Sequence, residues 1–181
     1  MSHEAEEQVR RTTPQDLLVR PFTILDQQWA LLVAGSEHPN PMTVSWGGLG
    51  TLWNRPVATV YVRPSRFTFS VLKADPFFTL NFLPEPYRAA LDLCGSTSGR
   101  NTDKWQATSL GRVPGETVPV PRVAEAELAL ECRVLATLDL DPARFLESAI
   151  HELYPKKDYH RVFLGEVLMA FAAERYLPQN D

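Results

Sequence analysis

The sequence predicts an α+β, β-rich fold in which a barrel or strongly curved sheet carries short inserted helices. Fifteen prolines are spread along 181 residues, and proline interrupts both helices and central strands, so a long helical bundle is excluded. Several short runs of β-branched and aromatic residues end at glycine or proline. From Leu128 to Leu140 every even-numbered residue is apolar, which is the period of a half-buried strand.

In the first half of the chain, strands are expected at 29–34, 42–46, 56–63 and 77–83. Three glycines, Gly47, Gly48 and Gly50, are expected to loosen the backbone between the second and third of them. Ser65 is placed to cap a short helix that ends before Asp75-Pro76.

A second helix is expected over 87–94, with Gly95 ending it in the left-handed conformation, and a polar loop then leads to a helix that begins near Asp103. Asp141-Pro142 predicts the start of another helix. Its apolar stripe would consist of Phe145, Leu146, Ala149, Ile150 and Leu153. A last strand at 159–171 brings the expected total to five or six.

Composition indicates one domain over 1–181, because 44% hydrophobic and 22% charged residues are ordinary values and no repeat or linker divides the chain. The net charge of -4 without a basic run excludes a nucleic-acid partner. Residues 1–13 lack a signal-peptide apolar region, and no stretch has the length of a membrane span, so we expect a cytoplasmic protein without a membrane partner. Cys94 and Cys132 are expected to be reduced thiols, and no metal-ligand spacing is present.

Three segments contain residue types that core packing does not require. Asn40 to Gly48 offers glycines that let backbone groups approach a flat ring, although a bulged strand with a core tryptophan explains the same residues. Arg63 to Thr68 joins a strand to a helix, where free N–H groups and two guanidiniums suit a terminal phosphate. The alternative there is a plain serine cap with solvated arginines.

Cys94 to Trp105 combines small hydroxyls, two glycines, Arg100 and Lys104, as a ligand-binding loop does. Its alternative is a solvated surface loop that caps the next helix. His160 is a weaker, substrate-side candidate for a catalytic role, since a lone histidine is more often structural. Neither a G-x-G-x-x-G turn after a strand nor a Walker loop occurs, so a Rossmann-type nucleotide site is not expected.

Together these segments resemble the flavin reductase-like family of FMN-binding split barrels, and in particular its flavoredoxin-type branch. The resemblance covers roughly Trp29 to Phe171. It rests on five stretches in order: Asn40-Pro41-Met42-Thr43 with Trp46-Gly47, Arg55-Pro56-Val57, Val62-Arg63-Pro64-Ser65-Arg66, Cys94-Gly95-Ser96 through Ser98-Gly99-Arg100 to Asp103-Lys104, and Asp158-Tyr159-His160 through Gly165-Glu166. Asn101 departs from the family pattern, which has an aspartate there.

The resemblance implies a six-stranded split barrel that forms a homodimer, with residues 1–20 as an extension that packs in the dimer or is partly flexible. It implies FMN near the subunit interface. The residues implied to bind it are Met42, Thr43, Val44, Ser45 and Trp46 at the ring, Arg63, Pro64, Ser65 and Arg66 at the phosphate, and Ser96, Ser98, Gly99, Arg100 and Lys104 over the ribityl-phosphate side.

The expected function is an NAD(P)H-dependent flavin reductase that passes hydride or electrons through FMN, with NADH or NADPH as donor. A flavoredoxin-type electron carrier, with a redox partner protein and no nicotinamide site, is the alternative. A split barrel that has lost flavin is a third reading. The sequence does not distinguish NADH from NADPH, identify the final acceptor, or decide whether FMN stays bound.

Overall fold

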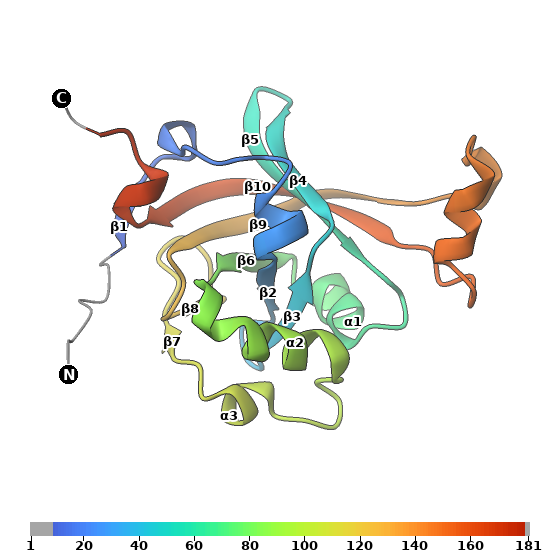
Figure 1. Cartoon of the computed structure of the whole chain (residues 1–181), viewed down its shortest axis with the longest axis horizontal. Coiled ribbons are helices and arrows are strands. Elements are labelled where there is room, and N and C mark those ends of the chain that lie inside the picture. The colour runs from blue at the N-terminus through green and yellow to red at the C-terminus, as the bar shows by residue number, and fades with distance from the viewer. Residues whose placement is uncertain (1–8, 180–181) are drawn as a thin grey trace.

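The computed structural model describes residues 9–179, which form one large antiparallel sheet with helices packed on its outside (Figure 1). The eight-stranded sheet has the order β3-β2-β6-β9-β10-β5-β4, and β1 pairs with β10. Its strands are β1 (Arg10–Thr12), β2 (Ala30–Ala34), β3 (Asn40–Val44), β4 (Gly47–Leu52), β5 (Arg55–Val62), β6 (Phe77–Phe82), β9 (Leu128–Asp139) and β10 (Arg161–Ala172). A separate two-stranded sheet pairs β7 (Arg112–Val113) with β8 (Arg122–Val123).

The helices are short, as the prolines predict. The α-helices are α1 (Phe67–Ala74), α2 (Arg88–Ser96) and α3 (Lys104–Thr108). One π-helix, η2 (Ile24–Gln28), precedes β2, and the 3₁₀ helices are η1 (Pro14–Asp16), η3 (Glu85–Tyr87), η4 (Pro142–Arg144), η5 (Ser148–Leu153) and η6 (Glu174–Tyr176).

Both faces of the central strands are buried. In β2, Ala30, Leu32 and Ala34 pack in one apolar cluster inside the curved sheet with Phe78, Phe82 and Phe163. Leu31 and Val33 point to a second cluster, under α2 and α3. This explains why β2 is a continuous apolar run rather than an alternating one.

The structure confirms the predicted strand over 128–139 and the helix that Asp103 caps. Cys94 and Cys132 are free thiols, as expected, and both are buried. The glycines after Trp46 were misjudged, because Gly47–Leu52 is strand β4, paired with β5. Gly47 allows that pairing, since a Cβ there would lie 2.5 Å from the carbonyl oxygen of Thr59. The short strand β1 was not expected either, and together β1 and β4 raise the sheet above the expected five or six strands.

Two predicted helix caps are wrong. The cap position of α1 is Arg66, without a side-chain cap, because the Ser65 hydroxyl donates instead to Asp158 Oδ2 at 2.9 Å. Gly95 does not end α2, which continues to Ser96. Side chains from elsewhere, Arg66 and Lys104, bind the carbonyls of the last α2 turn, so no left-handed glycine is needed there.

The long helix predicted after Asp141 is also wrong, although Asp141 does cap the short 3₁₀ helix η4, whose first residue is Pro142. Residues 141–159, which we call the arm, contain only η4 and η5 and project away from the sheet (Figure 1). Leu146 is fully exposed and Leu153 is half exposed, whereas Phe145 packs on Tyr154 and Tyr159 of the same arm, so the predicted residues do not form one buried stripe. A helix of this length needs such packing.

The N-terminal extension lies partly within the described residues. Arg10, Arg11 and Thr12 pair with Ala172, Phe171 and Ala170, so this portion extends the sheet. Residues 1–8 lie outside the described part of the chain.

Candidate functional site

A cavity of about 200 Å³ lies where the start of α1 meets the loop after α2. We call it the basic pocket. It is lined by Asn40, Ser65, Arg66, Phe67, Thr68, Ser96, Thr97, Ser98, Gly99 and Lys104. Two of the segments selected from the sequence, 63–68 and 94–105, therefore meet here. The segment 40–48 contributes its first residue, Asn40.

Arg66 and Lys104 bring two cations to this pocket. Arg66 donates to the carbonyl oxygens of Gly95 at 2.7 Å and Cys94 at 3.3 Å. Lys104 donates to those of Pro41 and Cys94, both at 2.9 Å. An ammonium has three N–H donors and a guanidinium has five, so each cation keeps donors for a further partner.

The two cations lack a compensating negative charge in the pocket, whose lining contains no acidic side chain. The pKa of Lys104 is lowered to about 8, chiefly by burial and in smaller part by the Arg66 charge. Burial also lowers the pKa of Arg66. A bound anion would stabilise the charged forms of Lys104 and Arg66 and so raise both pKa values.

The neighbouring backbone supports an anion as well. The first amides of α1 lie at the positive end of its dipole, and although that of Phe69 donates to the Arg66 carbonyl, those of Phe67 and Thr68 precede the first turn of helical bonds. Opposite them, Gly99 packs against Asn40, since a Cβ on Gly99 would lie 1.8 Å from Asn40 Oδ1. The amide of Asn40 in turn donates to Thr68 Oγ1 at 2.9 Å. Glycine at position 99 is thus required for the loop to close against α1.

A second cavity, of about 510 Å³, which we call the aromatic cleft, lies beyond the other end of β3. It is lined by Pro21, Phe22, Leu25, Asp26, Ser45, Trp46, Gly47, Tyr61, Leu140 and Tyr154. Asn40 lines the basic pocket and Ser45 lines the cleft. Five residues of strand at about 3.3 Å each span roughly 17 Å, which is close to the length of an extended flavin mononucleotide.

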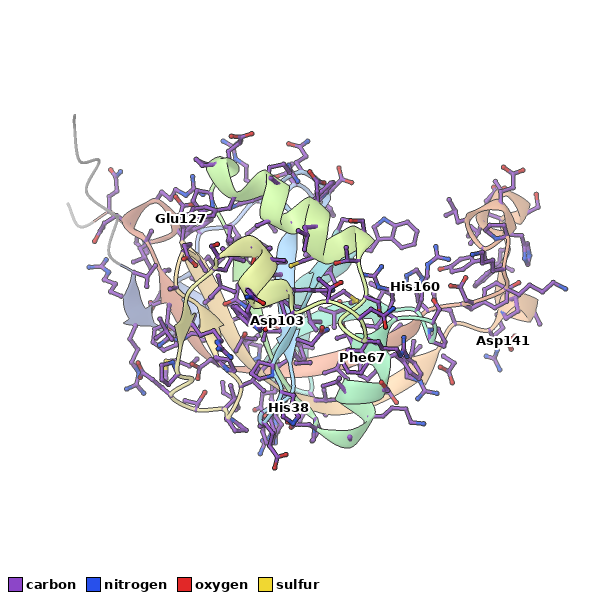
Figure 2. All side chains as sticks on the ribbon, turned by 90° about the horizontal axis from the view of Figure 1, so that it is seen from below. His38, Phe67, Asp103, Glu127, Asp141 and His160 are labelled. Atoms are coloured by element: carbon purple, nitrogen blue, oxygen red, sulfur yellow. The ribbon has the colours of Figure 1, made fainter. Side chains whose placement is uncertain are left out.

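His160 is buried and lies between the sheet and the arm (Figure 2). Its ring centroid is 5.2 Å from that of Trp46 and 6.4 Å from that of Tyr61. Nδ1 is 2.8 Å from the Tyr154 hydroxyl. Burial lowers the pKa of His160 to about 4, so the ring is neutral near pH 7.

The structure places some predicted residues elsewhere. Arg63 binds Asp158 Oδ1 at 2.8 Å and the Leu153 carbonyl at 3.0 Å, so it holds the arm and does not line the basic pocket. Met42 and Val44 point into the apolar core, whereas Thr43 donates to the Leu91 carbonyl at 2.5 Å.

Two further predicted residues lie at the edge of the basic pocket. Pro64 is exposed between β5 and α1. Arg100 lies across the start of α1, where it donates to the Ser65 carbonyl at 3.3 Å and covers the Phe67 ring.

Some lining residues were not predicted. Asn40 belongs to the first segment selected from the sequence but was not named there as a binding residue; it is a buried polar residue at the start of an apolar strand, which is unusual. Tyr61 and Tyr154 have no signal in the sequence, since strand and arm aromatics do not reveal which cavity they face.

Residues 9–179 contain no group of three or more His, Cys, Asp or Glu side chains that could hold a metal ion. Within the same range, none of the helices has the length and apolar character needed to cross a membrane.

Comparison with known proteins identifies relatives of this fold. A protein of Archaeoglobus fulgidus described as uncharacterized is 30% identical over 143 residues, which is 76% of this chain and 68% of that protein. The structure is similar to that of an FMN-binding protein from Thermus thermophilus with bound p-hydroxybenzaldehyde, at 25% identity and TM-score 0.66, covering 91% of this chain and 82% of that one. It is also similar to a flavoredoxin from Methanosarcina acetivorans, at 26% identity and TM-score 0.67, covering 94% and 78%.

These matches confirm the β-rich α+β fold with a large antiparallel sheet and few helices. The model of the flavin reductase-like domain matches residues 26–178, which is most of the chain. The chain therefore belongs to the flavin reductase-like domain family.

Proposed function

We propose that this protein binds FMN and acts as an NAD(P)H-dependent flavin oxidoreductase. The observation that carries the proposal is the basic pocket, where the buried Lys104 and the half-buried Arg66 have no acidic partner in the lining. A phosphate fits such a donor set better than a neutral group, because charge-assisted hydrogen bonds are the strong ones.

The second support is the arrangement of the two cavities. With the phosphate in the basic pocket, the ring system would extend along β3 toward Ser45 and Trp46 in the aromatic cleft. The cleft offers aromatic and apolar walls that exclude water from a flat ligand. The similarity to an FMN-binding protein of Thermus thermophilus supports this choice of ligand.

Bound FMN supplies the redox chemistry, since its ring accepts a hydride from a reduced nicotinamide. The residues of this chain would have three tasks. Arg66, Lys104 and the first amides of α1 bind the phosphate, Ser45 and Trp46 orient the ring, and the cleft leaves one face open to a second substrate. We place the protein in the cytoplasm as a homodimer, with FMN near the subunit interface.

The test is an anaerobic titration of the FMN-loaded protein with NADH and then NADPH, followed by the visible absorbance of flavin. Bleaching by either nucleotide faster than that of free FMN supports the oxidoreductase. A colourless protein that takes up no FMN refutes the cofactor assignment.

The second candidate is an electron carrier that exchanges electrons with a protein partner. The similarity to a flavoredoxin favours it. FMN that binds tightly but stays oxidised with both nucleotides would select this function over the reductase.

A further inference from the structure

Thr68 is the second residue of α1, and only 1% of its surface is exposed. It lines the basic pocket beside Asn40, whose side-chain amide donates to Thr68 Oγ1 at 2.9 Å. The hydroxyl therefore accepts one hydrogen bond from the protein and still has a proton to donate. Among the hydrogen bonds of residues 9–179, none is donated by this hydroxyl. A buried donor without an acceptor is costly, so the unused proton points to a ligand.

The direction of this hydrogen bond depends on which end of the Asn40 amide faces Thr68. The other end faces Gly99, where a Cβ would lie 1.8 Å from Asn40 Oδ1, so the hydrogen that glycine carries in its place is directed at this oxygen. A C–H group is a weak donor that suits an oxygen and would repel an NH₂ group. The amide oxygen therefore lies toward Gly99, and the NH₂ group donates to Thr68.

Thr79 in β6 shows the same arrangement with its acceptor present. The Asn81 amide donates to Thr79 Oγ1 at 2.9 Å, and the Thr79 hydroxyl donates to the Pro121 carbonyl at 2.8 Å. Thr68 and Thr79 are the two buried threonines of residues 9–179. The protein thus supplies both hydrogen bonds of Thr79, whereas at Thr68 it supplies one and leaves the donor to the pocket.

The position of Thr68 in α1 explains why its hydroxyl has no acceptor in the helix. Hydroxyls inside a helix often donate to a carbonyl three or four residues earlier, as Ser70 does to Phe67 at 2.7 Å. For Thr68 those carbonyls belong to residues before the helix, and that of Ser65 accepts from Arg100. The hydroxyl proton of Thr68 is thus free to point into the pocket.

We propose that Thr68 binds the phosphate in the basic pocket and that Asn40 is its positioning residue. The Asn40 amide occupies one lone pair of Oγ1 and so turns the O–H toward the bound anion, beside the cations Arg66 and Lys104. A hydroxyl that already accepts a hydrogen bond is polarised and donates more strongly. This inference rests on the proposed function for the identity of the ligand, and it adds two residues to the phosphate site.

The test compares FMN with riboflavin, which has the same ring and ribityl chain without the phosphate. Flavin fluorescence gives both dissociation constants in the wild type and in Thr68→Val, which keeps the shape of the side chain and removes the hydroxyl. We expect the FMN constant of Thr68→Val to rise at least about tenfold, while that of riboflavin changes by less than about threefold. Thr68→Ser, which restores the hydroxyl, should regain most of the FMN affinity.

Thr79→Val is the matched control, because it removes the hydroxyl of the other Asn–Thr pair, which does not line the basic pocket. It should leave the ratio of the two dissociation constants unchanged. Asn40→Asp tests the positioning role, since a carboxylate only accepts and would take the Thr68 proton. In the Asn40→Asp background, Thr68→Val should therefore change FMN affinity by less than about threefold.

Equal FMN affinity in Thr68→Val and the wild type overturns the proposal, and so does an equal loss of affinity for FMN and riboflavin. An effect of Thr68→Val in the Asn40→Asp background as large as in the wild type refutes the role of Asn40. If Thr68→Val fails to fold, Thr68→Ala removes the same hydroxyl and is interpreted in the same way.

A wild type that binds no FMN refutes the proposed function, and calorimetry with inorganic phosphate then tests this inference alone. Weaker phosphate binding in Thr68→Val than in the wild type and Thr79→Val supports it. Equal phosphate affinity in the three proteins, or no phosphate binding by the wild type, overturns it.

Discussion

Lys104 and Arg66 share one acceptor: Lys104 Nζ is 2.9 Å and an Arg66 guanidinium nitrogen 3.3 Å from the carbonyl oxygen of Cys94. A single neutral oxygen thus holds two like charges together at the end of α2. The carbonyls of a helix C-terminus carry partial negative charge, which offsets part of their repulsion. The repulsion that is not offset would be relieved by a bound anion. The first two predictions depend on this attraction between the two cations and an anion.

FMN affinity should depend on pH through Lys104. Its pKa is lowered to about 8 in the unliganded protein, so above pH 8 the free protein has lost a proton that phosphate binding favours. Affinity should be constant from pH 6.5 to 7.5 and should then fall by up to about tenfold per pH unit above 8. Fluorescence titration of FMN at each pH measures this, and Lys104→Met should bind more weakly with a flat profile. A wild-type profile that stays flat to pH 9.5 contradicts the assignment.

Arg66→Ala should weaken FMN binding by at least about tenfold, since a charge-assisted contact to phosphate is lost. Arg63→Ala is the matched control, because it removes a guanidinium from the same segment but one that binds the arm. Dissociation constants from FMN fluorescence, with urea unfolding alongside, separate binding from folding. Should Arg63→Ala lose more affinity than Arg66→Ala, the phosphate lies elsewhere.

Gly99→Ala should disrupt the basic pocket, because the new methyl group would occupy the position of Asn40 Oδ1. We expect FMN affinity to fall by an order of magnitude or more as the loop moves away from α1. Gly50→Ala is a suitable comparison, since a Cβ there meets no atom within 4 Å. If both variants bind FMN like the wild type, the loop does not form part of the site.

Glu131→Gln should destabilise the fold by about 3 kcal/mol, because it breaks a fully buried ion pair. Glu131 lies 3.1 Å from Arg122 Nε and accepts from the amides of Glu116 and Thr117 at 2.9 and 2.6 Å. Urea unfolding gives the free energy change. Glu166→Gln, which removes a charge from exposed arginine partners, should cost less than about 1 kcal/mol. Equal losses in the two variants would refute the role assigned to burial.

The sequence was most informative where one local signal determined one local structure. The alternation from Leu128 to Leu140 identified β9, and Asp103 identified the start of α3. It was misleading where a distant partner decided the outcome. Serine is a typical helix-capping residue, yet the Ser65 hydroxyl donates its hydrogen bond to Asp158, which is far away in the sequence. Glycine is typical of loops, yet Gly47 lies in a strand, where the absence of a side chain lets β4 pack against Thr59.

The candidate site shows the same division. The segments around Arg66 and Lys104 were identified from their donors, and the structure brings them into one cavity. Arg63 has the same side chain as Arg66 and lies three residues before it. Residue types alone do not show that Arg63 points toward the arm and Arg66 toward the pocket. The contact between Tyr154 and His160 could not be predicted from the sequence, because it depends on the path by which the arm returns to the sheet.

Asp158 accepts hydrogen bonds from Arg63 and from Ser65, and Ser65 also lines the basic pocket. One carboxylate is therefore shared between the root of the arm and a wall of that pocket. An anion that draws the Ser65 hydroxyl away from Asp158 would alter the balance of bonds at the arm. By thermodynamic reciprocity, whatever steadies the arm changes the affinity of the pocket by the same factor. The arm and the basic pocket are thus linked through a hydroxyl and a carboxylate, without a change of fold.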